Sequence, residues 1–158
     1  MSDKTSTVTG ELESILGRTQ QALEELLAAI EKVAPARFER ERRDGDSVKR
    51  VLERAVDDVN LYYGSLVANA LSLPQPPYME PASFSSLGEA MASLHLAHRR
   101  FSNLLHDLSP EDLERTTRLE STSEYTLRQV LETAAAHHRV RARRIREAVT
   151  PAAKRRSK

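Results

Sequence analysis

Apolar residues recur at steps of three and four positions along several long stretches of the chain, which is the spacing of amphipathic helices. The first predicted helix carries one apolar stripe and stops before Pro35. Its stripe consists of Leu12, Ile15, Leu16, Leu23, Leu26, Leu27, Ile30 and Val33. A second helix is expected to open at Asp46–Ser47, where either side chain can cap the first turn, and to end before Pro74. Its predicted inner side consists of Val48, Val51, Leu52, Ala55, Val59, Tyr62, Leu66 and Ala70.

The third predicted helix begins at Ser85–Ser86, because Glu89 follows Ser86 at the spacing of a capping box. Its stripe consists of Leu87, Met91, Leu94, His98, Phe101, Leu105 and Leu108. A short helical turn is expected at Pro110, and residues 116–123 form a connection. The fourth helix begins between Ser123 and Thr126 and closes at Pro151. Its predicted inner side consists of Leu127, Val130, Leu131, Ala134, His138, Ala142, Ile145 and Val149.

Four amphipathic helices without a strand pattern predict an all-α fold, a four-helix bundle of the up-down type with a long loop, Leu73–Ser85, between its second and third helices. The length of 158 residues fits one domain, over residues 1–150, followed by a basic disordered tail, 151–158. No apolar run reaches the roughly 18–20 residues that span a bilayer. The first ten residues lack a hydrophobic signal core, so a cytoplasmic protein with no membrane partner is expected.

Charge and cysteine content narrow the possible functions. Lys and Arg total 24 against 23 Asp and Glu, so net charge gives no support to a general nucleic-acid role. Basic residues do gather after position 139, but no aromatic residues are interleaved to stack on bases, which favours a solvated helix end. The absence of cysteine excludes disulfides, cysteine-based zinc sites and thiol chemistry by the protein itself. Phosphate-binding glycine loops and a Ser-His-acid signature are also missing.

Histidine is the remaining residue type that could bind a metal or transfer a proton. The chain contains five: His95, His98, His106, His137 and His138. His98 falls on the apolar stripe of the third helix, whereas His137 and His138 straddle the inner side of the fourth. Imidazoles inside a bundle can ligate zinc, nickel or iron, but a site needs about three convergent ligands. A histidine pair four residues apart is missing, because Arg141 and Ala142 occupy those positions. For any single histidine, a hydrogen-bonded core or boundary position is the simpler interpretation.

Two segments of the sequence resemble the DinB-like (YfiT-like) superfamily of four-helix bundles. The first, Ser47–Asp58, is similar to the opening of that family's second helix. The second runs from Thr126 to Leu131 and continues through His137–Ile145, which resembles the family's His-x-x-His-His-x-x-Gln-Ile helix. The helix order and the long loop between the second and third helices fit the same family.

The resemblance implies a divalent metal bound by one histidine of the second helix and two of the fourth. Carried over position by position, these ligands fall at Arg54, His137 and Arg141, and the family's glutamine falls at Arg144. Arginine stays protonated and offers no lone pair to a metal. The inherited metal site is therefore expected to be lost, and no catalytic residue is assigned.

Two arginines directed into a bundle need counter-charge, and Asp58 lies four residues after Arg54. The sequence therefore predicts a polar network that could hold a small anion, made of Arg54, Asp58, His137 and Arg141. In an alternative, both arginines extend outward with their heads in water. In a further alternative, a displaced zinc or nickel ion is held by His98, His137, His138 and Asp58, with Asp57 able to replace Asp58.

These patterns leave several functions open. The preferred one is a non-catalytic bundle that binds a small anionic ligand, with Tyr78, Met79 and Phe84 of the long loop covering the pocket. The alternative is a metal-dependent enzyme, a thiol-dependent transferase, isomerase or hydrolase, with a rearranged His/Asp site. A third is a structural role as a symmetric homodimer formed through helix faces, to which Tyr62 and Tyr63 would contribute.

Overall fold

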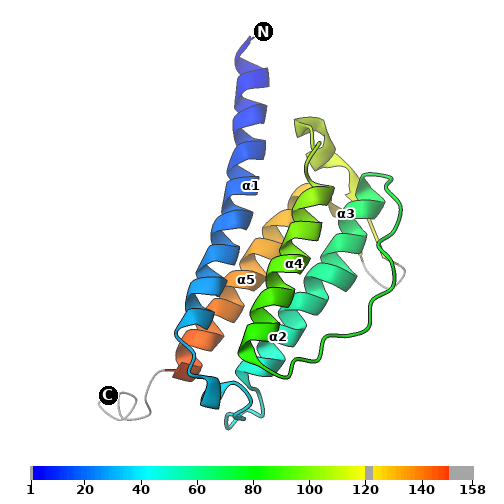
Figure 1. Cartoon of the computed structure of the whole chain (residues 1–158). Helices are drawn as coiled ribbons and strands as arrows, with labels where there is room; N and C mark the ends of the chain where they lie inside the picture. Colours follow the sequence, from blue (N-terminus) through cyan, green and yellow to red (C-terminus); the bar gives the residue numbers. More distant parts are fainter. Residues whose placement is uncertain (1, 120–122, 150–158) are drawn as a thin grey trace.

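The computed structural model of the chain describes residues 2–119 and 123–149 (Figure 1). The predicted helix stop at Pro151 and the predicted basic tail, 151–158, lie outside the described residues. Nearly all regular structure is helical, so the predicted all-α class is confirmed. The α-helices are α1 (Ser2–Glu31), α2 (Val48–Asp57), α3 (Gly64–Ala70), α4 (Leu87–Leu104) and α5 (Leu127–Val149). Short 3₁₀ turns occur at Pro35–Arg37 and, as the proline pattern predicts, at Pro110–Glu114.

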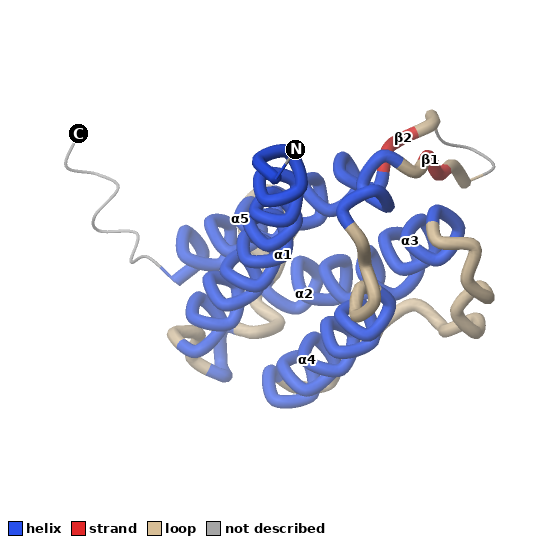
Figure 2. Tube along the Cα trace, turned by 90° about the horizontal axis from the view of Figure 1, so that it is seen from above, coloured by secondary structure: helices blue, strands red, loops and turns tan. Residues whose placement is uncertain are grey.

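The long helical segments lie side by side (Figures 1 and 2). α2 and α3 form one continuous helical rod, because a π-helical segment, Asp58–Tyr63, joins them without a break. The rod runs in the same direction as α4, whereas α1 and α5 run the opposite way (Figure 1). The predicted up-down alternation is therefore wrong between the rod and α4, because the long loop that joins them returns the chain to the other end. α1 packs most extensively against α5, and α2 contacts both α4 and α5. The candidate site described below lies between α2 and α5.

The buried residues follow the predicted stripe closely on α5 and less closely on α4, where Leu94 and Phe101 are buried but Leu87, Met91 and His98 are only partly buried. On α5 the buried side chains are Leu127, Val130, Leu131, Ala134, Ala135, His138, Ala142 and Ile145. On the α2–α3 rod, Tyr63 is 1% exposed and Tyr62 only half-buried, where the pattern predicts Tyr62 inside. Val56, Val67 and Ala68 are buried in addition to the predicted positions. Both tyrosines lie in the π-helical segment, whose turn is wider than the α-helical turn on which the predicted pattern is based.

Helix starts are capped as the sequence predicts. Ser47 Oγ accepts the N–H of Arg50 at 3.2 Å, and Ser86 Oγ accepts the N–H of Glu89 at 3.2 Å. The Glu89 carboxylate in turn accepts a hydrogen bond from the N–H of Ser85, at 2.8 Å. Each cap satisfies a backbone donor that the first helical turn leaves free.

The expectation of no strands is wrong in one small place. β1 (Thr116–Thr117) and β2 (Tyr125–Thr126) pair antiparallel beside the end of α3 (Figure 2). Thr117 is buried, and its hydroxyl donates to the carbonyl oxygen of Leu66 at 2.7 Å. This hydrogen bond fixes the extended segment that contains β1 to the α2–α3 rod. Each strand is only two residues long, which is too short to show an alternating hydrophobic pattern in the sequence. None of the helices in residues 2–119 and 123–149 combines the length and the apolar character needed to cross a lipid bilayer.

Candidate functional site

The π-helical segment Asp58–Tyr63, η2, orients the α2–α3 rod toward α5. At its end the N–H of Gly64 donates to the carbonyl oxygen of Val59, five residues earlier. A Cβ atom at position 64 would lie 2.9 Å from that oxygen, so the wide turn is fitted to glycine. Hydrogen bonds of this span place residues five apart near the same side of the helix. Asp58 and Tyr63, the first and last residues of η2, therefore both face α5.

α5 meets these two residues with two side chains spaced four apart. Arg141 Nη2 donates to Asp58 Oδ2, and the Tyr63 hydroxyl is hydrogen-bonded to His137 Nδ1. The Arg141 side chain is 15% exposed and that of Asp58 34%, so their ion pair is largely shielded from water. The structure thus brings together three of the predicted site residues, Asp58, His137 and Arg141.

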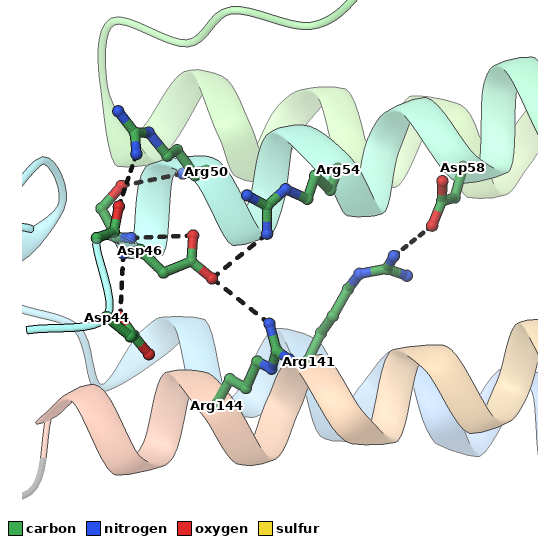
Figure 3. Close-up of polar contacts among 9 residues, drawn as sticks. Asp44, Asp46, Arg50, Arg54, Asp58, Arg141 and Arg144 are labelled. Carbon is green, nitrogen blue, oxygen red and sulfur yellow. Dashed lines mark hydrogen bonds and ion pairs between the residues drawn. The ribbon is translucent and has the colours of Figure 1, made fainter. Parts of the chain in front are cut away.

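Arg54 does not pair with Asp58, which corrects the predicted network. Its Nη1 lies 3.4 Å from Asp46 Oδ2, and its side chain is 59% exposed (Figure 3). Cβ atoms on a helix tilt toward its N-terminus, so a long side chain at position 54 leans back toward the start of α2. Asp46 lies just before that start. Of the two predicted arrangements, outward extension therefore describes Arg54 and an inward ion pair describes Arg141.

Arg144 completes a cluster of guanidinium groups between α2 and α5. Its Nη1 lies 3.5 Å from the same Asp46 oxygen that Arg54 approaches, so the two arginines meet from opposite helices (Figure 3). A cavity of about 240 Å³ opens between these helices. Its lining residues are Val51, Arg54, His137, Val140, Arg141 and Arg144. Three guanidinium groups and one imidazole thus surround a space that no carboxylate lines.

The predicted cover for this cavity is wrong. None of the residues of the loop between α3 and α4 lines the cavity, because that loop is docked on another side of α2. The N–H of Ala82 donates to Asp57 Oδ1 at 2.7 Å, and the N–H of Phe84 donates to Glu53 Oε2 at 2.9 Å. Phe84 is buried in the core, whereas Tyr78 is 85% exposed.

The surroundings of Tyr63 and His137 determine the protonation states of these two side chains. Burial raises the pKa of the Tyr63 hydroxyl, and the nearby Asp58 carboxylate raises it further. Burial lowers the pKa of His137, and the positive charge of Arg141 lowers it again. Both groups are therefore neutral near pH 7, and the phenol donates to Nδ1. The imidazole proton is then assigned to Nε2.

His138 lies deeper than the cavity. It is 3% exposed, and burial, followed by the charge of Arg141, lowers its pKa to about 4. Its Nδ1 atom has no hydrogen-bond partner among the described residues, and neither has Arg141 Nη1. The His138 imidazole is therefore a neutral core group near pH 7.

The structure does not assemble the alternative metal set of His98, His137, His138 and Asp58. Within the part of the chain that the structure describes, no three His, Asp or Glu residues are grouped so that they could hold a metal ion. His98 Nε2 lies 2.9 Å from Gln20 Oε1 and 3.2 Å from Ser102 Oγ, so it bridges α4 and α1. Asp57, the possible substitute for Asp58, binds the Ala82 N–H instead.

Sequence reasoning did not include Asp46, Tyr63 or Arg144 in the predicted network, although the resemblance placed Arg144 at the family's glutamine position. Arg144 carries a usable signal, because it follows Arg141 by three residues and therefore lies on the same face of α5. Comparison of the chain with protein-family models, with curated proteins and with solved structures finds no significant match.

Proposed function

We propose that the chain is a four-helix bundle of the DinB-like type in which a small-anion site has taken the place of the family's metal site. One observation carries the proposal: Arg54, Arg141, Arg144 and His137 line a single cavity that contains no carboxylate. Guanidinium groups recognise carboxylates and phosphates through paired, charge-assisted hydrogen bonds.

The arginines have unused donor capacity. Each guanidinium carries five N–H donors in a planar fork. Arg54 and Arg144 reach one oxygen of Asp46 at 3.4 and 3.5 Å. Charge-assisted bonds of this kind are usually about 2.7–2.9 Å long, so both contacts are loose and leave room for a stronger acceptor. Arg141 Nη1 also has no partner among the described residues, although this atom is buried, so a ligand would reach it only after a small movement of the side chain.

The cavity suits a small organic ion. Its volume of about 240 Å³ lies below the range of roughly 300–1,000 Å³ that is typical for drug-sized ligands. Val51 from α2 and Val140 from α5 supply apolar wall on either side of the arginines. A ligand with one anionic group and a short carbon body would match both parts of this lining.

Isothermal titration calorimetry of the full chain at constant ionic strength tests the proposal, with sodium benzoate as the first probe and phenyl phosphate as the second. Saturable binding of at least one probe is expected. Arg54→Gln and Arg144→Gln should each weaken binding about tenfold or more, because a hydrogen bond to a charged group contributes roughly 1.5–3 kcal/mol. Both side chains are more than half exposed, so the variants should fold.

Arg143→Gln is the matched control, because Arg143 is an exposed arginine of α5 that does not line the cavity. It should leave the affinity unchanged within about twofold. The proposal would be contradicted if both probes gave no saturable heat, or if the control weakened binding as much as the cavity variants do.

The alternative of a metal-dependent enzyme needs about three ligands around an ion. Elemental analysis of the purified chain tests that alternative, since stoichiometric zinc or nickel would favour the enzyme over the anion-binding bundle. The homodimer and the cytoplasmic location stay predictions. Tyr63 cannot contribute to a dimer contact as proposed, because it is buried within the chain; Tyr62 is half-buried. Light scattering tests the dimer.

A further inference from the structure

We infer that the anion this cavity takes is a phosphate monoester, held through its phosphoryl group by Arg54, Arg141 and Arg144 and through its organic part by Val51 and Val140. The inference rests on the proposed anion-binding function and specifies the chemical class of the ligand.

The placement of the three guanidinium groups distinguishes a phosphoryl group from a carboxylate. Arg54 approaches from α2, and Arg141 and Arg144 approach from successive turns of α5. Arg54 and Arg144 already converge on a single oxygen, that of Asp46 (Figure 3). A phosphate monoester offers three terminal oxygens in a tetrahedral arrangement, so it can engage three forks that arrive from different directions. A planar carboxylate has only two oxygens, so two of the three guanidinium groups would have to share one of them, as Arg54 and Arg144 share the Asp46 oxygen.

Every polar group of the lining donates hydrogen bonds. The arginines have no acceptor atoms, and the Tyr63 hydroxyl engages His137 Nδ1, which leaves the Nε2 proton as the free imidazole donor. A phosphate monoester carries a charge of about −1.5 to −2 near pH 7 and presents only acceptor oxygens in its dianionic form. The lining therefore matches a dianion without leaving a ligand donor unpaired.

The charge pattern along α5 supports a dianion rather than a monoanion. Between Glu132 and Glu147 the helix contains no acidic residue, and the arginines in that interval are Arg139, Arg141, Arg143, Arg144 and Arg146. Of these, Arg141 and Arg144 line the cavity, whereas Arg139 lies 3.8 Å from Glu25. Charges of one sign along a cleft raise the local concentration of the opposite ion. The two carboxylates nearest the cluster, Asp46 and Asp58, do not line the cavity.

Phenyl phosphate and sodium benzoate form the test pair, because they share the ring and differ in the anionic group. Calorimetry of the full chain near pH 7.5 should give at least tenfold tighter binding of phenyl phosphate. Inorganic phosphate should bind at least threefold more weakly than phenyl phosphate, since it lacks the apolar part. Arg54→Gln and Arg144→Gln should each reduce the preference for phenyl phosphate over benzoate to threefold or less, whereas Arg143→Gln should retain it.

The outcomes separate this inference from the function on which it rests. Benzoate binding that equals or exceeds phenyl phosphate binding would overturn the phosphate monoester and leave the anion site standing. Equal binding of inorganic phosphate would overturn the ester. Failure of all three probes to bind would contradict the anion site itself. A preference that survives both cavity variants would overturn the inference by placing the selectivity elsewhere.

Discussion

The π-helical segment η2 makes one stability prediction unusually specific. Glycine is normally the poorest residue of a helix interior apart from proline, and its replacement by alanine in a helix stabilises it by up to about 1 kcal/mol. At position 64 the opposite sign is expected. A Cβ atom there would lie 2.9 Å from the carbonyl oxygen of Val59, the acceptor of the Gly64 N–H.

The magnitude follows from the cost of relieving this contact. The backbone of the wide turn must move by several tenths of an ångström, and insertion of a methyl group into a well-packed region costs typically about 1–3 kcal/mol. After subtraction of the propensity gain of up to about 1 kcal/mol, Gly64→Ala should lower the free energy of unfolding by about 1 kcal/mol, within a range of roughly 0–2 kcal/mol. Movement of η2 would also turn Asp58 and Tyr63 away from Arg141 and His137.

Gly17→Ala is the matched control. Gly17 lies inside α1, it is exposed, and a Cβ atom there would meet nothing within 4 Å. This variant should gain up to about 1 kcal/mol in the same urea-denaturation assay, so the two variants should differ by about 2 kcal/mol with opposite signs. A Gly64→Ala protein as stable as the Gly17→Ala protein would refute the reasoning, because η2 would then tolerate a side chain.

Three further predictions each concern one buried or paired side chain. Asp58→Asn should cost about 2 kcal/mol, because the Arg141 side chain is only 15% exposed and loses its carboxylate; in a double-mutant cycle with Arg141→Gln, additive losses would contradict a coupled pair. His138 has a pKa lowered from 6.5 to about 4, so only the unfolded chain binds its proton between these values and stability is lost as the pH falls. From pH 7 to pH 5 the loss from this residue should be about 2 kcal/mol in urea titrations, and His138→Gln should remove it; an unchanged pH slope would contradict the assignment. Asp57→Ala should speed hydrogen exchange at the Ala82 amide about five- to tenfold, as expected for a bond of roughly 1 kcal/mol, whereas Glu53→Ala should act at Phe84 instead; equal effects of both variants at both amides would contradict separate contacts.

Much of the fold could be predicted because helical periodicity reports burial directly. The predicted inner side of α5 matches the buried residues from Leu127 to Ile145, including His138. The N-cap at Ser47 could be predicted because a short polar side chain precedes an apolar repeat with helical spacing. The error at Tyr62 falls inside the π-helical segment, where the α-helical period used for the prediction does not apply, whereas the predicted Leu66 and Ala70 beyond it are buried. Gly64 within an apolar helical stretch is the one sequence signal of that turn.

The candidate site was predicted in part. Register on α5 places His137 and Arg141 on adjacent turns of one face. The need for counter-charge placed Asp58 in the predicted network, but it paired Asp58 with Arg54 by spacing, whereas the structure pairs Asp58 with Arg141. The partner of Arg54 could not be obtained from spacing alone. Asp58 and Asp46 are four and eight residues away, and the tilt of the side chain, together with the loop that positions Asp46, decides between them. The approach of Arg144 and Arg54 to the same Asp46 oxygen depends on how α2 packs against α5, and sequence periodicity does not predict that packing.

The arginine-lined cavity is the central claim, and the most direct test observes the guanidinium groups themselves. In ¹H–¹⁵N spectra of the arginine Nε–Hε groups, titration with phenyl phosphate should shift the signals of Arg54, Arg141 and Arg144 along one saturable curve, while that of Arg143 stays in place. Signals that do not move, or that all move together without saturation, would contradict a binding site between α2 and α5.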